Sequence, residues 1–485
     1  MNFVKFIQNA RKADFLVVQP RMGFTHLRAM QQGLAAVKAA GHDPESPFGG
    51  RIPTIGTITL DSYTRVRDDA SARRALDEGR TLNGFPICAH GADATGAMLY
   101  AIQDETFPIQ VRHGCPTPED IFKVLIQAGI DATEGGPASY CLPYSRTPLK
   151  TAIASWRACS EMLGEEAARD GGHVIHLESF GGCMLGQLCP PELLVAISVL
   201  ECIFFQTYGV KSVSMSYAQG TSMAQDIAAL AAMRRLAHEY LTVDWHVVLY
   251  TYMGVFPLTV QGATDLLSES VFLARAKVNV AAPGQEEKLE RCADRIIVKT
   301  PAEAHRIPTI AENMASLTHA HNYSRELMRN PRALPTPFDD DLYTQAKRVI
   351  ESVLAEAGAA EGHGNYPHLD LAFDKAFKKG LLDVPFCLHI DNAKKSRAYI
   401  DKGGALRWLN VGNMALEIRN PGAHPDQLGP EEFRAMLAQV QAHYDDKYFK
   451  NNTARMVDGA NPALLGISTS EAPQGENQND EVVPA

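Results

Sequence analysis

The chain has 485 residues, enough for one large domain with additions or for two or three ordinary domains. Hydrophobic residues make up 45%, charged residues 21%, and the formal net charge is −10, which argues against nucleic acid or anionic lipid as the main partner. The 9 cysteines are scattered without a Cys-x-x-Cys pair. No early segment resembles a signal peptide, and no run reaches the roughly 18 apolar residues of a membrane span, so we expect reduced thiols and a cytoplasmic location.

Apolar, β-branched runs alternate along the chain with segments of helical period. We predict nine strands, at residues 15–19, 54–60, 82–87, 108–114, 132–136, 173–180, 212–217, 247–252 and 295–300. Near-continuous apolar strands that alternate with helices are typical of a parallel sheet covered on both faces. Eight such units close into a (β/α)8 TIM barrel of about 300 residues, so one predicted strand is spare and the sequence does not say which. A doubly wound open sheet is the rival fold, but no G-x-G-x-x-G loop follows any strand.

The pattern changes after about residue 310. Helical segments, a Gly/Pro/His-rich break at 362–368 and short mixed segments predict a smaller α+β extension. We therefore predict a barrel catalytic domain at 1–310, a helical and α+β region packed on the barrel at 311–466, and a disordered acidic tail at 467–485.

Arginines stand at three of the predicted strand ends. Arg21 ends the first apolar run in VVQPRMGF, Arg65 follows the second, and Arg112 lies near the end of the fourth. Barrel active sites form where strands end, so the three side chains should converge on one cavity mouth. Each arginine alone is more often a surface ion pair, but three together predict a ligand with two carboxylates or a phosphate, which the planar guanidinium grips with paired hydrogen bonds.

Acidic and phenolic residues occupy similar places. Glu134 precedes Gly135-Gly136 and Glu178 ends the run at 173–180, while Tyr140 and Tyr144 follow in SYCLPY. A carboxylate among arginines orients them or receives a substrate ammonium; the alternatives are a structural ion pair for Glu134 and simple packing for the tyrosines.

Two further residues carry open alternatives. Lys299 ends the last strand four residues before Glu303; a lysine there forms a Schiff base, as in barrel aldolases, contacts a ligand hydroxyl, or makes a surface pair. His113, beside Arg112, touches a ligand or hydrogen-bonds within the core. The histidine and cysteine spacing predicts no metal site.

The motifs resemble the large (epsilon) subunit of adenosylcobalamin-dependent glutamate mutase, also called methylaspartate mutase. The matching pieces run in order from about residue 15 to 415: QPRMG, LDSYTR, LNGFP, QVRHGCP, EGGPASYCLPY, ESFGG, MAQDIAAL, YMGVFP, IIVKTPAEAHRIPT, GLLDVPF and RWLNVGN. The resemblance implies a (β/α)8 barrel with a C-terminal extension.

The resemblance also implies residue roles. The predicted catalytic residues are Glu134, Tyr144 and Glu178. The predicted substrate-binding residues, with the arginines on two carboxylates and Glu134 on the ammonium, are Arg21, Arg65, Arg112, His113, Glu134, Tyr140 and Tyr144. The predicted cofactor-binding residues, with the lysine and last glutamate near the adenosyl ribose, are Gly23, Asn83, Phe180, Met253, Gly254, Lys299 and Glu303.

The implied reaction is a radical carbon-skeleton rearrangement of L-glutamate to (2S,3S)-3-methylaspartate. The implied cofactor is adenosylcobalamin, held through cobalt by a separate small subunit with an Asp-x-His-x-x-Gly motif, which this chain lacks. The family arrangement implies a homodimer of this chain within a heterotetramer.

The chain departs from the family pattern near the implied pocket. Met22 and Phe24 replace smaller residues, and Tyr250 and Tyr252 replace a histidine and a tryptophan. We expect any altered specificity first at Met22 and Phe24. A related mutase acting on another amino acid, a non-catalytic homologue that binds a small acid or a corrinoid protein, and a Schiff-base aldolase remain alternatives.

Overall fold

A computed structural model gives the fold. It describes residues 3–143, 145–169, 171–184, 188–281, 285–303, 305–338, 341–358, 364–418 and 429–460. The predicted tail at 467–485 lies outside these residues.

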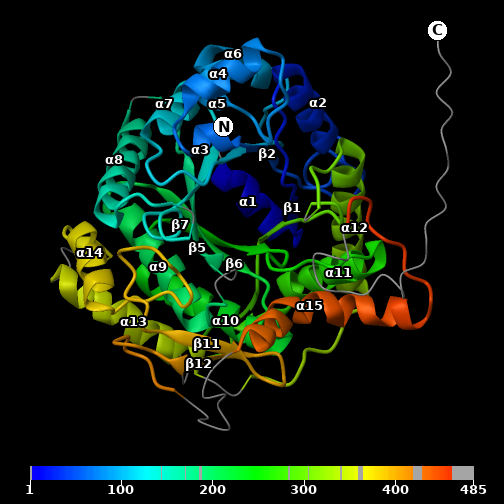
Figure 1. The fold of residues 1–485 in the computed structure, drawn as a ribbon. Coiled ribbons are helices and arrows are strands. Elements are labelled where there is room, and N and C mark those ends of the chain that lie inside the picture. The colour runs from blue at the N-terminus through cyan, green and yellow to red at the C-terminus, as the bar shows by residue number, and fades with distance from the viewer. Residues whose placement is uncertain are drawn as a thin grey trace.

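Eight parallel strands form the centre of the molecule (Figure 1). They are β1 (Val17–Gln19), β2 (Gly56–Thr59), β3 (Ile109–Arg112), β4 (Ala132–Gly135), β5 (His176–Gly182), β6 (Ser212–Ala218), β7 (Asp244–Tyr250) and β10 (Arg295–Ile297). Their order in the sheet is β1-β10-β7-β6-β5-β4-β3-β2. Val18 of β1 makes a parallel bridge to Thr54, just before β2, which closes the sheet and confirms the predicted barrel.

The spare predicted strand is 82–87. This segment packs along the end of β2 with one isolated bridge, Leu60 to Phe85. A Cβ on Gly84 would lie 2.5 Å from the Leu60 carbonyl carbon, and Pro86 has no N–H for a ladder. The apolar residues therefore form a buried loop instead of a strand.

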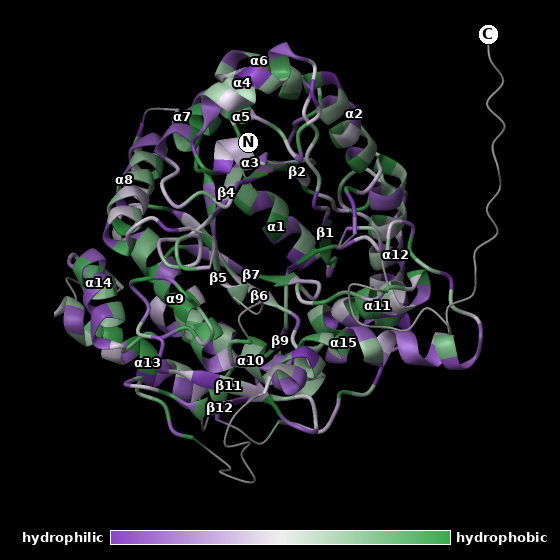
Figure 2. Ribbon diagram, viewed as in Figure 1, coloured by the Kyte–Doolittle hydropathy of each residue, from purple (hydrophilic) through white to green (hydrophobic). Residues whose placement is uncertain are grey.

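Helices surround the barrel, and hydrophobic residues gather on the faces that turn toward the sheet (Figure 2). Those of the barrel region are α2 (Leu27–Lys38), α3 (Ser62–Arg65), α4 (Asp69–Asp77), α5 (Ile87–His90), α6 (Ala92–Leu99), α7 (Glu119–Gln127), α8 (Leu149–Ala168), α9 (Pro191–Thr207), α10 (Met223–Tyr240), α11 (Val260–Arg275) and α12 (Ile310–Arg329). Helix α12 packs on α11, α2 and β1, so it joins the ring of helices around the barrel. A hairpin of β8 (Lys277–Asn279) and β9 (Leu289–Arg291) precedes β10.

The amino end of the barrel is covered by α1 (Phe3–Lys12), which crosses the centre of the ring in Figure 1. Phe3 stacks on His176 at the start of β5, with ring centroids 4.6 Å apart. The open end is therefore the carboxyl end of the strands, where the predicted site lies.

The C-terminal extension gathers on one side of the barrel (Figure 1). It consists of α13 (Leu342–Ala357), α14 (Leu369–Lys379), β11 (Arg397–Ile400), β12 (Leu406–Asn410) and α15 (Pro430–Lys450). Helix α13 packs on α9 and α10, α14 packs on α8, and α15 packs on α11.

The barrel interior is polar where aliphatic side chains usually fill it. Fully buried polar residues project from several strands: Gln19, Thr57, Gln110, Glu178, Ser214 and Arg295. Arg295 donates to Gln110 Oε1 at 2.8 Å and also to Gln19 and Glu178. These contacts satisfy the buried groups and form a charged floor beneath the open end.

Candidate active site

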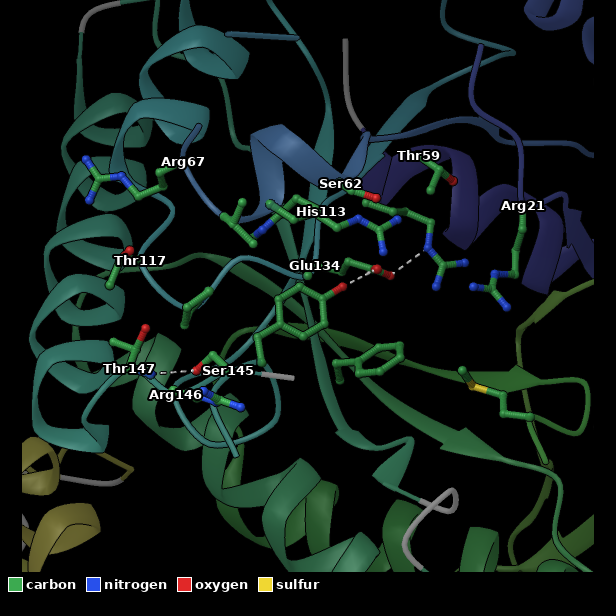
Figure 3. Close-up of a pocket in the computed structure, with 18 residues that line it drawn as sticks. Arg21, Thr59, Ser62, Arg67, His113, Thr117, Glu134, Ser145, Arg146 and Thr147 are labelled. Atoms are coloured by element: carbon green, nitrogen blue, oxygen red, sulfur yellow. Dashed lines mark hydrogen bonds and ion pairs between the residues drawn. The ribbon is translucent and has the colours of Figure 1, made fainter. Parts of the chain in front are cut away.

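A cavity of about 580 Å³ opens at the carboxyl ends of the strands (Figure 3). Eight residues predicted from sequence line it: Arg21, Arg65, Arg112, His113, Glu134, Tyr140, Phe180 and Met253. They come from different βα units, so convergence of strand ends assembles the cavity.

Arg112 at the end of β3 and Glu134 in β4 form a buried ion pair. Arg112 Nε lies 3.0 Å from Glu134 Oε2, and the residues are only 4% and 2% exposed. Burial lowers the pKa of Arg112, but the surrounding acidic groups, Glu134 first, together outweigh burial and hold that pKa well above its usual value. The hydroxyl of Tyr140 donates to Glu134 Oε1. Arg112 Nη1 is buried and has no hydrogen-bond partner among the described residues, which leaves a charged donor for a ligand.

Arg65 presents a second guanidinium. Its Nε donates to the Leu60 carbonyl at 3.1 Å, which orients the side chain. Burial and the charges of Arg21 and Arg112 lower the pKa of Arg65, partly opposed by Tyr140 and Glu134. Neighbouring cations with few partners favour an anionic ligand.

Arg21 approaches the cavity from the side opposite His113 (Figure 3). Its Nη1 lies 2.6 Å from Glu303 Oε1, so a predicted substrate residue and a predicted cofactor residue form one ion pair. The second oxygen of Glu303 is buried and has no partner within the part of the chain that the structure describes.

His113 is a neutral wall residue. Burial, and then the charge of Arg65, lower the pKa of His113 to about 3 despite a backbone hydrogen bond with Glu134. Its Nδ1 accepts the N–H of Cys115 at 3.1 Å, which places the proton of the neutral ring on Nε2. The His113 ring stacks on the Trp156 ring, with ring centroids 5.7 Å apart, so packing fixes the orientation of His113.

Lys299 lies behind the cavity wall. Its Nζ is 3.4 Å from the Tyr252 carbonyl and 4.2 Å from the centroid of the Phe256 ring. Burial lowers the pKa of Lys299 to about 8; Glu303 opposes this shift and Arg21 adds to it. Lys299 is not among the residues that line the cavity.

Glu178 lies beneath the cavity and does not line it. Its carboxylate accepts from Gln110 Nε2 at 3.1 Å, from Arg295 and from the Tyr250 hydroxyl. The Tyr250 hydroxyl links Glu178 to Glu134, which does line the cavity.

The remaining predicted residues lie at the rim. Asn83 holds Ser62, accepting its N–H at 2.9 Å and donating to its hydroxyl at 2.6 Å. A Cβ on Gly23 would lie 2.2 Å from the Thr59 carbonyl oxygen, and one on Gly254 would lie 2.3 Å from the Tyr252 hydroxyl. Both glycines allow close packing. Tyr144 lies outside the described residues.

Met22 and Phe24 do not line the cavity, contrary to our expectation that they alter specificity. Both side chains face Gly33 of α2, where a Cβ would lie 2.8 Å from Met22 Sδ and 2.7 Å from Phe24 Cε2. The missing side chain of Gly33 makes room for these larger residues, so they serve helix packing.

Several lining residues were not predicted from sequence. Among them are Thr59, Ser62, Arg67, Ser145, Arg146 and Thr147. The polar residues at the end of β2 and just after it, in TLDSYTR, were a usable signal for Thr59 and Ser62.

Two buried groups outside the cavity hold its wall. Glu201 of α9 accepts the N–H groups of Ala138 at 3.1 Å and Ser139 at 2.9 Å, fixing the turn before Tyr140. From the C-terminal extension, His389 Nε2 lies 3.0 Å from the Thr147 carbonyl.

The sequence matches the family model described as methylaspartate mutase E chain over residues 1–437. The chain belongs to this family. Similar proteins named glutamate mutase epsilon subunit occur in Haloarcula marismortui, 30% identical and covering 91% of this chain and 87% of the relative, and in Halobacterium salinarum, 30% identical and covering 87% and 83%. The one in Yersinia enterocolitica is 28% identical and covers 86% of this chain and 81% of the relative.

Membership of the methylaspartate mutase E chain family confirms the resemblance drawn from the motifs. Within the described ranges, no cluster of three or more His, Cys, Asp or Glu side chains could hold a metal ion. In the same part of the chain, no helix is both long and apolar enough to cross a membrane.

Proposed function

We propose that this chain is the catalytic subunit of an adenosylcobalamin-dependent mutase that interconverts L-glutamate and (2S,3S)-3-methylaspartate. The observation that carries the proposal is the convergence of three arginines with Glu134 in one cavity at the barrel mouth. Two carboxylates and an ammonium in the substrate match guanidinium donors and a carboxylate acceptor.

In this proposal the arginines hold the two substrate carboxylates and Glu134 receives the ammonium. Arg112 Nη1 and the Arg65 guanidinium supply donors, while neutral His113 supplies a wall. Substrate fragments held at both carboxylates stay in position for recombination.

The residues beside the cavity fit the adenosyl group of the cofactor. The Lys299 ammonium has donors beyond its contact with Tyr252, and Glu303 Oε2 is a buried acceptor to which no described residue donates. A donor and an acceptor side by side suit the two hydroxyls of a ribose. Phe180 and Met253 offer an apolar surface at the cavity wall. When bound, adenosylcobalamin supplies the radical that removes a hydrogen atom from the substrate.

We further propose that cobalt is held by a small partner subunit with the Asp-x-His-x-x-Gly motif. By analogy with the family, we propose a homodimer of this chain within a heterotetramer. The free cysteines, eight of them buried, agree with a cytoplasmic location.

One observation favours a second candidate, a related mutase with another amino-acid substrate. Tyr250 departs from the family pattern, and its hydroxyl donates a hydrogen bond of 2.8 Å to Glu134 Oε2. The aldolase alternative is less favoured, because Lys299 lies behind the cavity wall.

Reconstitution tests the proposal. The chain is mixed in dim light with a cognate corrinoid-binding subunit, adenosylcobalamin and L-glutamate, and 3-methylaspartate is measured. Product formation supports the proposal. No product, with a radical signal elicited by a different amino acid, supports the second candidate. Borohydride trapping of substrate on Lys299 supports the aldolase.

A further inference from the structure

Tyr250 stands between two buried carboxylates from neighbouring strands. Glu134 of β4 and Glu178 of β5 are register partners in the parallel sheet. The Tyr250 hydroxyl lies 2.8 Å from Glu134 Oε2 and also contacts Glu178 Oε1. Two like charges side by side in a dry interior repel each other, so a neutral donor between them is stabilising.

Each carboxylate also has its own arginine. Arg112 pairs with Glu134, and Arg295 pairs with Glu178. The side chains form a row across the barrel in the order Arg112, Glu134, Tyr250, Glu178, Arg295. The row joins the wall of the cavity to the polar floor beneath it.

Packing fixes the ring of Tyr250 on two sides. The Arg112 guanidinium lies 4.8 Å from its centroid, and Phe180 meets it edge to face at 5.5 Å and 87°. Burial, with the charges of Glu134 and Glu178 and against that of Arg112, raises the pKa of Tyr250 well above its usual value, so the hydroxyl keeps its hydrogen. A phenol has one hydrogen and donates to one carboxylate at a time. When the Tyr250 hydroxyl donates to Glu178, Glu134 loses that hydrogen bond and is held less firmly.

We propose that Tyr250 is a positioning residue that fixes Glu134 for the substrate ammonium and couples it to the buried pair of Glu178 and Arg295. This inference rests on the proposed function and deepens it. Glu134 Oε2 is held by Arg112 and Tyr250, and Oε1 takes one hydrogen bond from Tyr140 and keeps a lone pair for another donor. Glu178 thus acts on the substrate through Tyr250.

The test compares L-glutamate with glutarate, which keeps both carboxylates and lacks the ammonium. Both are titrated calorimetrically into the full chain, alone and with the corrinoid-binding subunit and adenosylcobalamin. We expect Tyr250→Phe to weaken L-glutamate binding about tenfold, because a hydrogen bond to a buried charge is lost. Glutarate binding should stay within about twofold, because the arginines are unchanged.

Tyr217→Phe is the matched control. Tyr217 is a buried tyrosine on the adjacent strand β6, and its hydroxyl donates to Asp226 at 2.9 Å, away from this row. Tyr217→Phe should leave the affinities for L-glutamate and for glutarate unchanged. Equal weakening of L-glutamate and glutarate in Tyr250→Phe would mean general damage and would overturn the inference.

A double-mutant cycle tests the coupling. Glu178→Gln removes the competing carboxylate and leaves the Tyr250 hydroxyl to Glu134, so it should strengthen L-glutamate binding in the wild-type background but have no effect in Tyr250→Phe. Additive effects would overturn the coupling. Failure of the wild-type chain to bind L-glutamate in either state would instead refute the proposed function. Wild-type binding with unchanged discrimination in Tyr250→Phe would refute only the role of Tyr250.

Discussion

Replacing Arg65 with lysine tests the dicarboxylate clamp most directly. In the described part of the chain, the Leu60 carbonyl is the hydrogen-bond partner of Arg65, and Nε makes that contact. The two Nη groups are therefore available to a ligand in the cavity that Arg65 lines. Lysine offers one ammonium and loses one of two charge-assisted hydrogen bonds, which costs about 1.5–3 kcal/mol. The KM for L-glutamate should rise about tenfold to a hundredfold.

The measurement is the KM and kcat of the reconstituted enzyme, with calorimetric titration of L-glutamate as a check. Arg67→Lys is the matched control: Arg67 also lines the cavity, but it pairs with Asp120 at 2.8 Å and its side chain is 48% exposed. That exposed pair contributes little, so its KM should change by less than about twofold. A KM for Arg65→Lys as close to wild type as that of the control would refute the clamp.

Three further predictions concern the supports of the site. Glu201→Ala leaves the N–H groups of Ala138 and Ser139 buried without an acceptor, so the free energy of unfolding in urea should fall by about 2–4 kcal/mol, and an unchanged midpoint would contradict this. The pKa of Lys299 is lowered from 10.5 to about 8, so between these pH values the unfolded chain binds more protons than the native chain and the free energy of unfolding rises with pH. Lys299→Met should lack this rise in urea unfolding, and parallel pH profiles of the variant and the wild type would contradict the prediction. His389→Ala removes the contact with the Thr147 carbonyl, so amide hydrogen exchange in 145–149 should speed up, and unchanged exchange would argue against this support.

The barrel and the meeting of the arginines could be predicted because both follow from chain order. Apolar strands that alternate with helices close into a barrel, and residues at strand ends must then meet at one edge. This placed Arg21, Arg65 and Arg112 without any knowledge of distances. The prediction of a strand at 82–87 was wrong because it rested on the hydrophobic residues and gave too little weight to the Asn-Gly pair and Pro86, which are turn signals.

The depth of each side chain in the barrel could not be predicted. Glu178 and Glu134 both lie on inward positions of neighbouring strands, but one lies in the floor and the other in the cavity wall. The difference depends on how far each strand extends, which the residue pattern alone does not fix. Met22 and Phe24 show the same limit, because their contact with Gly33 joins two elements and follows from packing.

The three arginines are not equivalent before a ligand arrives. Arg112 pairs with Glu134 and Arg21 pairs with Glu303, whereas Arg65 has no carboxylate partner among the described residues. A first carboxylate therefore finds its best donors at Arg65 and the unpartnered Nη1 of Arg112. A second carboxylate at Arg21 must share that guanidinium with Glu303. Because Glu303 also suits the ribose of the cofactor, ligand contacts at the two ends of this ion pair are linked, and occupation of one end changes the charge available to the other.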